Sequence, residues 1–152
     1  MTNLTLIIPA KEESNSLPIV IDELKIYNYK KIVVIKEDDL KTYESIKDLN
    51  CEILFQSGNG YGNAIIDGIN KADTKYIAVF YADGSTDPKY LNPMIDKLEK
   101  NKLSIVFGSR YEKNAGSMDD NFTTKIGNFL FTVFGNIFFS LNMTDILFTY
   151  FV

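Results

Sequence analysis

The sequence predicts an α/β protein built on a mainly parallel sheet, with flanking helices and an apolar helix near the C-terminus. Short apolar runs alternate along the chain with segments of helical periodicity, and this alternation is typical of βαβ units with right-handed crossovers. The 152 residues, 45% of them hydrophobic and 24% charged, are enough for one globular core. We divide the chain into a core of residues 1–122 and an apolar helical segment of residues 123–152.

Five strands are expected in the core, because five short apolar runs are each bounded by turn, charge or helix signals. These strands cover residues 4–9, 31–36, 52–56, 76–80 and 103–107. The helices expected between them cover residues 17–27, 40–49, 63–72 and 88–100. In open α/β sheets ligands bind at the carboxyl ends of the strands, so the loops after these strands are the first place to look for a site.

The last predicted helix, residues 123–141, is apolar around most of its circumference. Its polar positions recur every four residues and form one narrow stripe. They are Asn128, Thr132, Asn136 and Ser140. The uncharged stretch of residues 126–144 is just long enough to span a bilayer, although its asparagines and glycines count against a span. Three interpretations stay open: a helix buried in the core or in a dimer contact, a helix in the membrane interface, and a membrane span.

The composition excludes several classes of function. A net charge of −4 and a pI near 4.8 argue against nucleic-acid binding, which normally needs a basic surface. The chain has no histidine and one cysteine, Cys51, so neither a zinc site nor an internal disulfide is expected. Any general base must be a carboxylate, a lysine or a tyrosine. Residues 4–9 are too short for a signal peptide, and we expect a cytoplasmic protein.

The loop after the fourth strand carries the strongest candidate site. Asp83 and Ser85 follow the apolar run directly, and Asp87 before Pro88 marks the start of the next helix. A carboxylate and a hydroxyl at the edge of a parallel sheet suit a hard divalent cation and the phosphates that it carries. Asp-Gly is also ordinary turn chemistry. Both interpretations of Asp83 stay open on the local sequence.

A glycine-rich loop lies between the third strand and the next helix. Gly58, Gly60 and Gly62 could expose backbone N–H groups to a phosphate or a sugar. The spacing matches neither the P-loop nor the dinucleotide fingerprint. The simpler interpretation is that glycine is needed there for a tight turn.

Taken in order, five short motifs resemble family 2 glycosyltransferases of the GT-A (Rossmann-like) fold, most closely the polyprenol- or dolichol-phosphate mannose and glucose synthases. The motifs are Ile8-Pro9-Ala10 with Glu12-Glu13, Gly60-Tyr61-Gly62-Asn63-Ala64, Ala82-Asp83-Gly84-Ser85 with Asp87-Pro88, Gly108-Ser109-Arg110-Tyr111, and Thr144-Asp145. The resemblance covers nearly the whole chain, and it is the order of the motifs that makes it specific.

The resemblance implies an inverting transfer from a nucleotide-sugar donor, UDP- or GDP-linked, bound across the carboxyl edge of the sheet. Asp83 and Arg110 are the catalytic residues that it implies, with Asp83 holding Mg²⁺ or Mn²⁺ and Arg110 facing phosphate charge. Ser85 is expected as a second metal contact. The other substrate-binding residues expected are Pro9, Ala10, Glu12, Glu37, Asp39, Gly60, Asn63, Ala82 and Lys125.

The absence of histidine bears on the acceptor. A lipid phosphate is already ionised near neutral pH and needs no general base, whereas a hydroxyl acceptor does. Together with the resemblance to polyprenol-phosphate sugar synthases, this favours a polyprenyl phosphate acceptor that approaches along the phenylalanine-rich residues 123–152. The same segment is expected to make a peripheral contact at the inner face of the membrane or a homodimer contact.

Three departures from the family pattern leave a second function open. Tyr81 stands where the metal motif Asp-x-Asp has its first aspartate, and the second strand ends in residues 36–39 instead of Asp-Asp-Gly-Ser. The sequence also stops at Val152, before a glycine–aromatic–arginine element, so we expect a truncated or naturally short form. The alternative is a non-catalytic domain that binds a nucleotide or a partner. A sugar-phosphate nucleotidyltransferase is disfavoured, because no glycine-rich basic loop follows the first strand.

Overall fold

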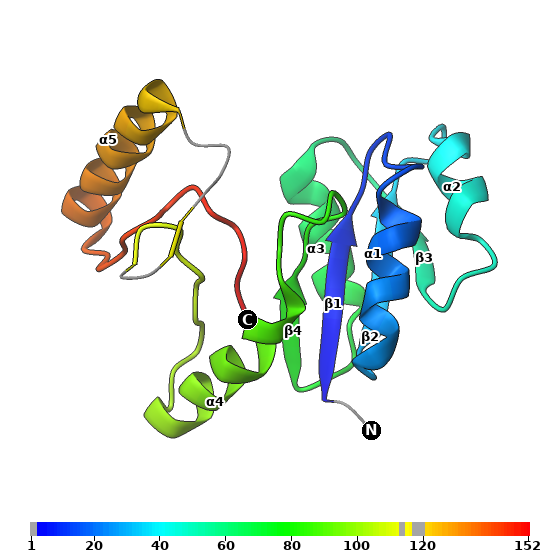
Figure 1. Ribbon diagram of the computed structural model, residues 1–152, viewed down its shortest axis with the longest axis horizontal. Helices are drawn as coiled ribbons and strands as arrows, with labels where there is room; N and C mark the ends of the chain where they lie inside the picture. The colour runs from blue at the N-terminus through cyan, green and yellow to red at the C-terminus, as the bar shows by residue number, and fades with distance from the viewer. Residues whose placement is uncertain (1–2, 113–114, 117–120) are drawn as a thin grey trace.

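A parallel sheet of four strands forms the centre of the computed structural model, which describes residues 3–112, 115–116 and 121–152 (Figure 1). The strands are β1 (Leu4–Pro9), β2 (Lys30–Ile35), β3 (Glu52–Phe55) and β4 (Tyr76–Val79). Their order across the sheet is β3-β2-β1-β4, so β1 lies between β2 and β4. The predicted α/β class with a mainly parallel sheet is confirmed.

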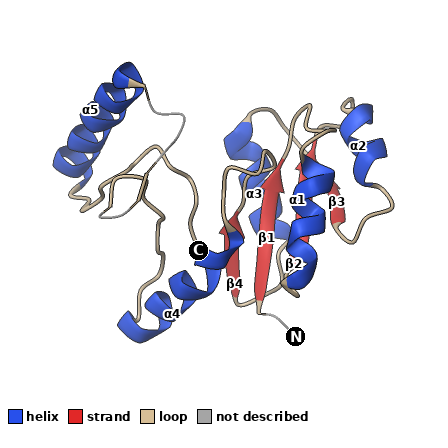
Figure 2. Cartoon of the chain, viewed as in Figure 1, coloured by secondary structure: helices blue, strands red, loops and turns tan. Residues whose placement is uncertain are grey.

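Helices cover both faces of the sheet, as Figure 2 shows. The helices of the core are α1 (Leu17–Glu23), α2 (Leu40–Ile46), α3 (Tyr61–Lys71) and α4 (Leu91–Asn101), with 3₁₀ turns at Leu24–Ile26 and Pro88–Tyr90. Helix α3 packs on one face, where Ala64 joins Ile7 and Ile32 in a small apolar cluster. Helices α1 and α4 cover the other face, and β1 is buried on both sides, which is typical of a parallel sheet.

The predicted fifth strand, residues 103–107, is not part of the parallel sheet. Instead, the C-terminal residues 150–152 lie between β4 and residues 106–108. Val106 and Val152 exchange two backbone hydrogen bonds of 2.9 and 3.0 Å, and Val79 N–H donates to the carbonyl of Phe151 at 3.2 Å. The prediction of a strand in the parallel sheet was wrong, because local β-propensity does not specify the partner or its direction.

Helix α5 (Phe122–Phe139) buries its polar side. Asn128 and Thr132 are buried, and the Thr132 hydroxyl accepts the backbone N–H of Ile146 at 3.3 Å. The Asn136 side chain pairs with the backbone N–H and C=O of Met143 at 3.0 and 2.9 Å. The predicted polar stripe is therefore the face that contacts the segment after the helix. Its fourth member, Ser140, is exposed and forms the left-handed C-cap of the helix.

The opposite side of α5 is apolar and exposed, and Figure 1 shows the helix beyond β4, apart from the helices on the sheet. Its large exposed side chains include Phe129, Phe131, Phe134, Phe138 and Phe139. Within the described residues no helix, α5 included, combines the length and the hydropathy needed to cross a bilayer.

Candidate functional site

The loops that follow β1 and β2 are joined by one carboxylate. Asp39 accepts the backbone N–H of Glu12 at 2.7 Å and, as the N-cap of α2, the backbone N–H of Thr42 at 3.2 Å. Burial opposes the charged form of Asp39, but these hydrogen bonds outweigh it and hold the pKa of the carboxyl below its usual range. Asp39, expected to bind substrate, therefore positions the loop that carries Glu12.

Four other residues expected to bind substrate lie at the same edge of the sheet. Pro9 ends β1, and the backbone N–H of Ala10 donates to Val34 O at 2.9 Å. Glu12 is exposed and has a φ of 60°, a value that non-glycine residues seldom adopt. Glu37 is exposed in the turn that follows β2. The structure thus brings Ala10 and Glu12 close to the end of β2.

Asp83 is exposed in the loop after β4, and it is a turn former. Its Oδ1 accepts the backbone N–H of Ser85 at 2.9 Å, and Gly84 between them has a φ of 80°. Ala82 is buried, while Ser85 is exposed. Because β4 pairs in parallel with β1, the loop that carries Asp83 lies at the same edge of the sheet as the loop that carries Glu12.

The glycine loop is closed by its own side chains. Asn63 Oδ1 accepts the backbone N–H of Gly58 at 2.9 Å, and Gln56 Nε2 donates to Gly60 O at 2.8 Å. Gly60 has a φ of 90° and is the N-cap of α3. These contacts support a conformational role for the glycine. Asn63, expected to contact substrate, has its side-chain oxygen engaged within the loop.

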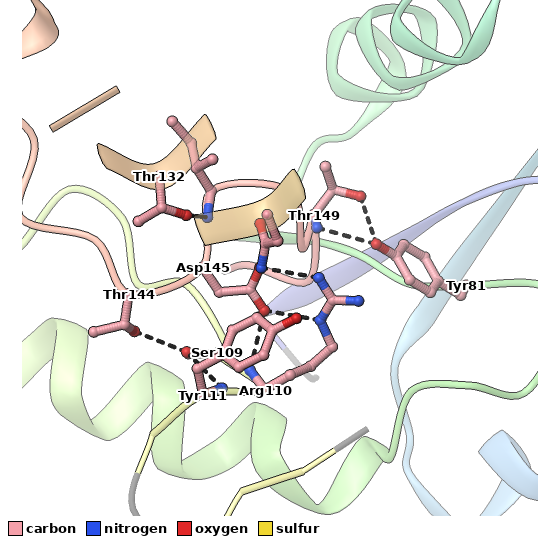
Figure 3. Close-up of polar contacts among 10 residues, drawn as sticks. Tyr81, Ser109, Arg110, Tyr111, Thr132, Thr144, Asp145 and Thr149 are labelled. Atoms are coloured by element: carbon pink, nitrogen blue, oxygen red, sulfur yellow. Dashed lines mark hydrogen bonds and ion pairs between the residues drawn. The ribbon is translucent and has the colours of Figure 1, made fainter. Parts of the chain in front are cut away.

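Arg110 forms a largely buried ion pair with Asp145. Its Nε and Nη2 donate to the two carboxylate oxygens at 2.8 and 3.0 Å, and its backbone N–H donates to the same carboxylate at 3.1 Å (Figure 3). The Asp145 side chain is fully buried, and the Arg110 side chain is 23% exposed. Asp145 was visible in the sequence as part of a motif, but its function as the anchor of Arg110 requires the fold.

The charge of Asp145 is stabilised by this arrangement. Burial alone would raise its pKa, but hydrogen bonds from Arg110 and from Asn128 on α5, together with the charge of Arg110, place the pKa below its usual range. The guanidinium also lies over an aromatic face, with its central carbon 5.1 Å from the centroid of the Phe148 ring. Asp145 therefore holds the edge of the Arg110 guanidinium, and Phe148 packs against its face.

Tyr81 turns toward the C-terminal segment. Its hydroxyl oxygen accepts the backbone N–H of Thr149 at 3.0 Å and lies 2.8 Å from the Thr149 hydroxyl (Figure 3). The hydroxyl of Tyr61, at the start of α3, lies 3.1 Å from the same Thr149 oxygen. The Tyr81 ring meets the Phe148 ring edge-on at a centroid distance of 5.9 Å. Tyr81 thus connects segments that are far apart in the sequence.

The remaining expected residue, Lys125, is exposed on the first turn of α5 and not in the loops after the strands. A hollow of about 450 Å³ lies between α5 and the segment that follows the helix. The residues that line it include Phe131, Phe134, Phe138, Ile146 and Leu147. In the part of the chain that the structure describes, histidine, cysteine and acidic side chains nowhere gather in threes as a ready-made metal site.

Sequence comparisons identify the family. An uncharacterized glycosyltransferase of Mycobacterium bovis is 29% identical over 107 residues, which are 70% of this chain and 48% of that protein. Uncharacterized glycosyltransferases from two strains of Mycobacterium tuberculosis match with the same identity and coverage. The chain thus spans about half the length of these curated relatives. The sequence model of glycosyl transferase family 2 matches residues 5–151, nearly the full length, and the parallel sheet with its flanking helices agrees with a GT-A fold. The chain therefore belongs to glycosyl transferase family 2.

Proposed function

We propose that the chain transfers a sugar from a UDP- or GDP-linked donor to a polyprenyl phosphate, with inversion at the anomeric carbon. The observation that carries the proposal is the exposed Asp83 carboxylate at the sheet edge that Asp39 and Glu12 also occupy, in a chain of family 2. An acidic turn at this edge is suited to a cation and a diphosphate.

The donor is assigned to the loops after β1, β2 and β4. Pro9, Ala10 and Glu12 would border the nucleoside, and the hydrogen bond from Glu12 to Asp39 would hold that border in place. The diphosphate would then extend toward Asp83. The carboxyl ends of the parallel strands lie at this edge, where open α/β sheets bind their ligands.

The residues present fit a divalent cation held mainly by the substrate. Mg²⁺ usually takes one or two protein carboxylates and completes its shell with phosphate oxygens and water. Asp83 supplies one such carboxylate, with Ser85 nearby in the chain, whereas the Tyr81 hydroxyl is engaged by Thr149. Bound there, Mg²⁺ or Mn²⁺ would neutralise charge on the departing nucleoside diphosphate.

The acceptor is assigned to the side of α5. An ionised phosphate oxygen can attack the anomeric carbon while the bond to the diphosphate breaks, so the reaction needs no general base. Arg110 would stabilise phosphate charge from a position that Asp145 fixes. The exposed phenylalanines of α5 and the hollow that they line would accept an isoprenoid chain or the inner face of a membrane.

Calorimetric titration with UDP- and GDP-sugars, with and without Mn²⁺, tests the donor. Metal-dependent binding followed by transfer to a short polyprenyl phosphate is the expected result, and the product should be a sugar phosphodiester of inverted configuration. Transfer to a soluble sugar with no transfer to polyprenyl phosphate would contradict the acceptor assignment.

Liposome flotation and detergent-free sedimentation test α5. A Phe134→Ser, Phe138→Ser double variant should float less than the wild type, because both rings are exposed on the apolar face. Ile26→Ser is the matched control, since Ile26 is 83% exposed and lies on a different helical segment. The homodimer contact would be favoured if the wild type sediments as a dimer, the double variant sediments as a monomer, and the wild type does not float with liposomes.

A non-catalytic domain that binds a nucleotide or a partner is the second candidate. The observation that favours it is Tyr81, whose phenol replaces a carboxylate and is occupied by Thr149. Nucleotide binding that is independent of metal, without donor hydrolysis or transfer, would support this function over the first.

A further inference from the structure

We propose that Tyr81 is a positioning residue for Arg110: it holds residues 148 and 149 so that the Phe148 ring supports the face of the guanidinium while Asp145 holds its edge. The contacts alone support the positioning of Arg110 by Tyr81. An effect of Tyr81 on the rate of sugar transfer rests, in addition, on the proposed function.

Tyr81 makes two different contacts with the same dipeptide. Its hydroxyl accepts the backbone N–H of Thr149 at 3.0 Å, which fixes the main chain at that point. Its ring meets the Phe148 ring at 5.9 Å and an interplanar angle of 84°, an edge-to-face pair. The Thr149 hydroxyl also contacts a second phenol, that of Tyr61. The dipeptide is therefore tied both to the end of β4 and to the start of α3.

Phe148 passes this constraint to Arg110. The guanidinium carbon lies 5.1 Å from the Phe148 centroid, within the range of a cation–π contact. Asp145 fixes the edge of the guanidinium through two hydrogen bonds, and Phe148 packs against its face. A residue in the loop that carries Asp83 thereby affects the orientation of the guanidinium that is expected to face phosphate charge.

The sequence offers a direct probe, because Arg110 is its only arginine. The Nε–Hε signal in a ¹⁵N correlation spectrum therefore belongs to Arg110 without further assignment. The ring current of Phe148 should displace this signal in the wild type. Tyr81→Phe keeps the ring and removes the acceptor for Thr149 N–H, so the signal should move or broaden.

Tyr76→Phe is the matched control, since the Tyr76 hydroxyl donates to Glu99 at the opposite end of β4. It should leave the Arg110 signal unchanged. An Arg110 signal that is the same in folded Tyr81→Phe as in the wild type would overturn the proposal. Should Tyr81→Phe not fold, Thr149→Val removes the hydroxyl contact to the same phenol, and the signal must then move in Thr149→Val.

Kinetics provide the second readout. Tyr81→Phe should lower kcat/KM about three- to tenfold, which is typical of one lost hydrogen bond. The loss should shrink in an Arg110→Lys background, because Tyr81 acts through Arg110. Equal losses in both backgrounds would contradict the coupling. A wild type without transferase activity would refute the proposed function, while the spectrum would still decide the role of Tyr81.

Discussion

Asp83 closes a turn with one carboxylate oxygen while the residue stays exposed to solvent. Its Oδ1 accepts the Ser85 N–H at 2.9 Å, and Gly84 between them adopts the positive φ that the turn requires. The turn needs an acceptor oxygen, whereas a divalent cation also needs negative charge. The structural and the proposed metal-binding roles can therefore be separated by chemistry.

Asp83→Asn should separate them. The amide oxygen can still accept the Ser85 N–H, so the free energy of unfolding should change by less than about 0.5 kcal/mol, as is usual at exposed positions. Metal-dependent donor binding in the calorimeter should be lost, because the amide carries no charge for the cation. Asp83→Ala should lose the same binding and also destabilise the turn by about 1 kcal/mol. Unchanged metal-dependent binding in Asp83→Ala would exclude Asp83 as a ligand.

Asp145→Asn should destabilise the fold strongly, since it removes the buried negative charge to which the Arg110 guanidinium donates two hydrogen bonds. The expected cost is about 3 kcal/mol, as for other buried pairs that lose one member. Urea denaturation near pH 7 measures it. Lys125→Gln is a suitable control, because Lys125 is exposed on the first turn of α5, and its free energy of unfolding should stay close to that of the wild type.

The Asp145 pair also predicts a dependence of stability on pH. The pKa of Asp145 is lower in the folded protein than in the unfolded chain, so the unfolded state binds the proton more readily as the pH falls. The stabilisation is complete above the unfolded value of about 3.9 and is lost as the pH drops through the lower folded value. Urea titrations from about pH 6 to pH 3 should therefore show a steeper loss in the wild type than in Asp145→Asn. Parallel curves would contradict this assignment.

The residues of the site differ in how far sequence alone could assign them. The place of Asp83 at the sheet edge was predictable, because a buried strand that ends before Asp-Gly-Ser leaves the aspartate there. The hydrogen bond that orients its carboxylate was not, since residue order does not specify side-chain rotamers. The sequence did not predict the contacts of Asp145 and Thr149, because their partners Arg110 and Tyr81 lie far away in the chain.

Between secondary-structure elements, the contact of α3 with β1 depends on a glycine. A Cβ at Gly68 would clash with the Ile7 side chain and would lie 3.3 Å from Val34 Cγ2. Gly68→Ala should therefore cost about 1–3 kcal/mol, as overpacked cores do, measured by chemical denaturation. Gly62→Ala in the same helix is the control, because a Cβ there meets nothing within 4 Å. That variant should be neutral or more stable, since alanine favours helix.

In helix α5, sequence periodicity identified the polar face but not what that face contacts. The four-residue recurrence predicted one narrow polar stripe, and the structure places Asn128, Thr132 and Asn136 of that stripe against residues 143–146. A periodic pattern indicates which residues share a face. It does not say whether that face meets water or another segment, and here the polar face is the buried one because residues 143–146 supply its hydrogen-bond partners.

Across the molecule, the C-terminal residues complete the core. Tyr150 is 3% exposed, packs edge-on against Phe80, and donates its hydroxyl to Asp87 O at 2.9 Å. Burial raises the pKa of its phenol, which therefore stays protonated throughout the neutral range. This single side chain connects the end of the chain to the loop after β4.

Tyr150→Ala should cost about 3–5 kcal/mol, the range for removal of a large buried aromatic side chain, whereas Tyr150→Phe should cost about 1 kcal/mol for one hydrogen bond. Hydrogen exchange provides the spatial readout. The amides of Val106 and Val152, which bond to one another, should lose protection together in Tyr150→Ala while the β1 amides remain protected. Independent exchange of Val106 and Val152 would show that the C-terminal residues are not a cooperative part of the core.

The sequence alone predicted the α/β class, four of the strands and the helices between them, together with the order of the family motifs. These are local properties, set by periodicity, capping and turn chemistry within about ten residues. The folded chain was needed to establish that residues 150–152 pair with residues 106–108, that Asp145 anchors Arg110, and that Tyr81 binds Thr149. The partners in the two side-chain contacts are 35 and 68 residues apart, and local propensity carries no information about which distant group satisfies a buried charge or hydroxyl.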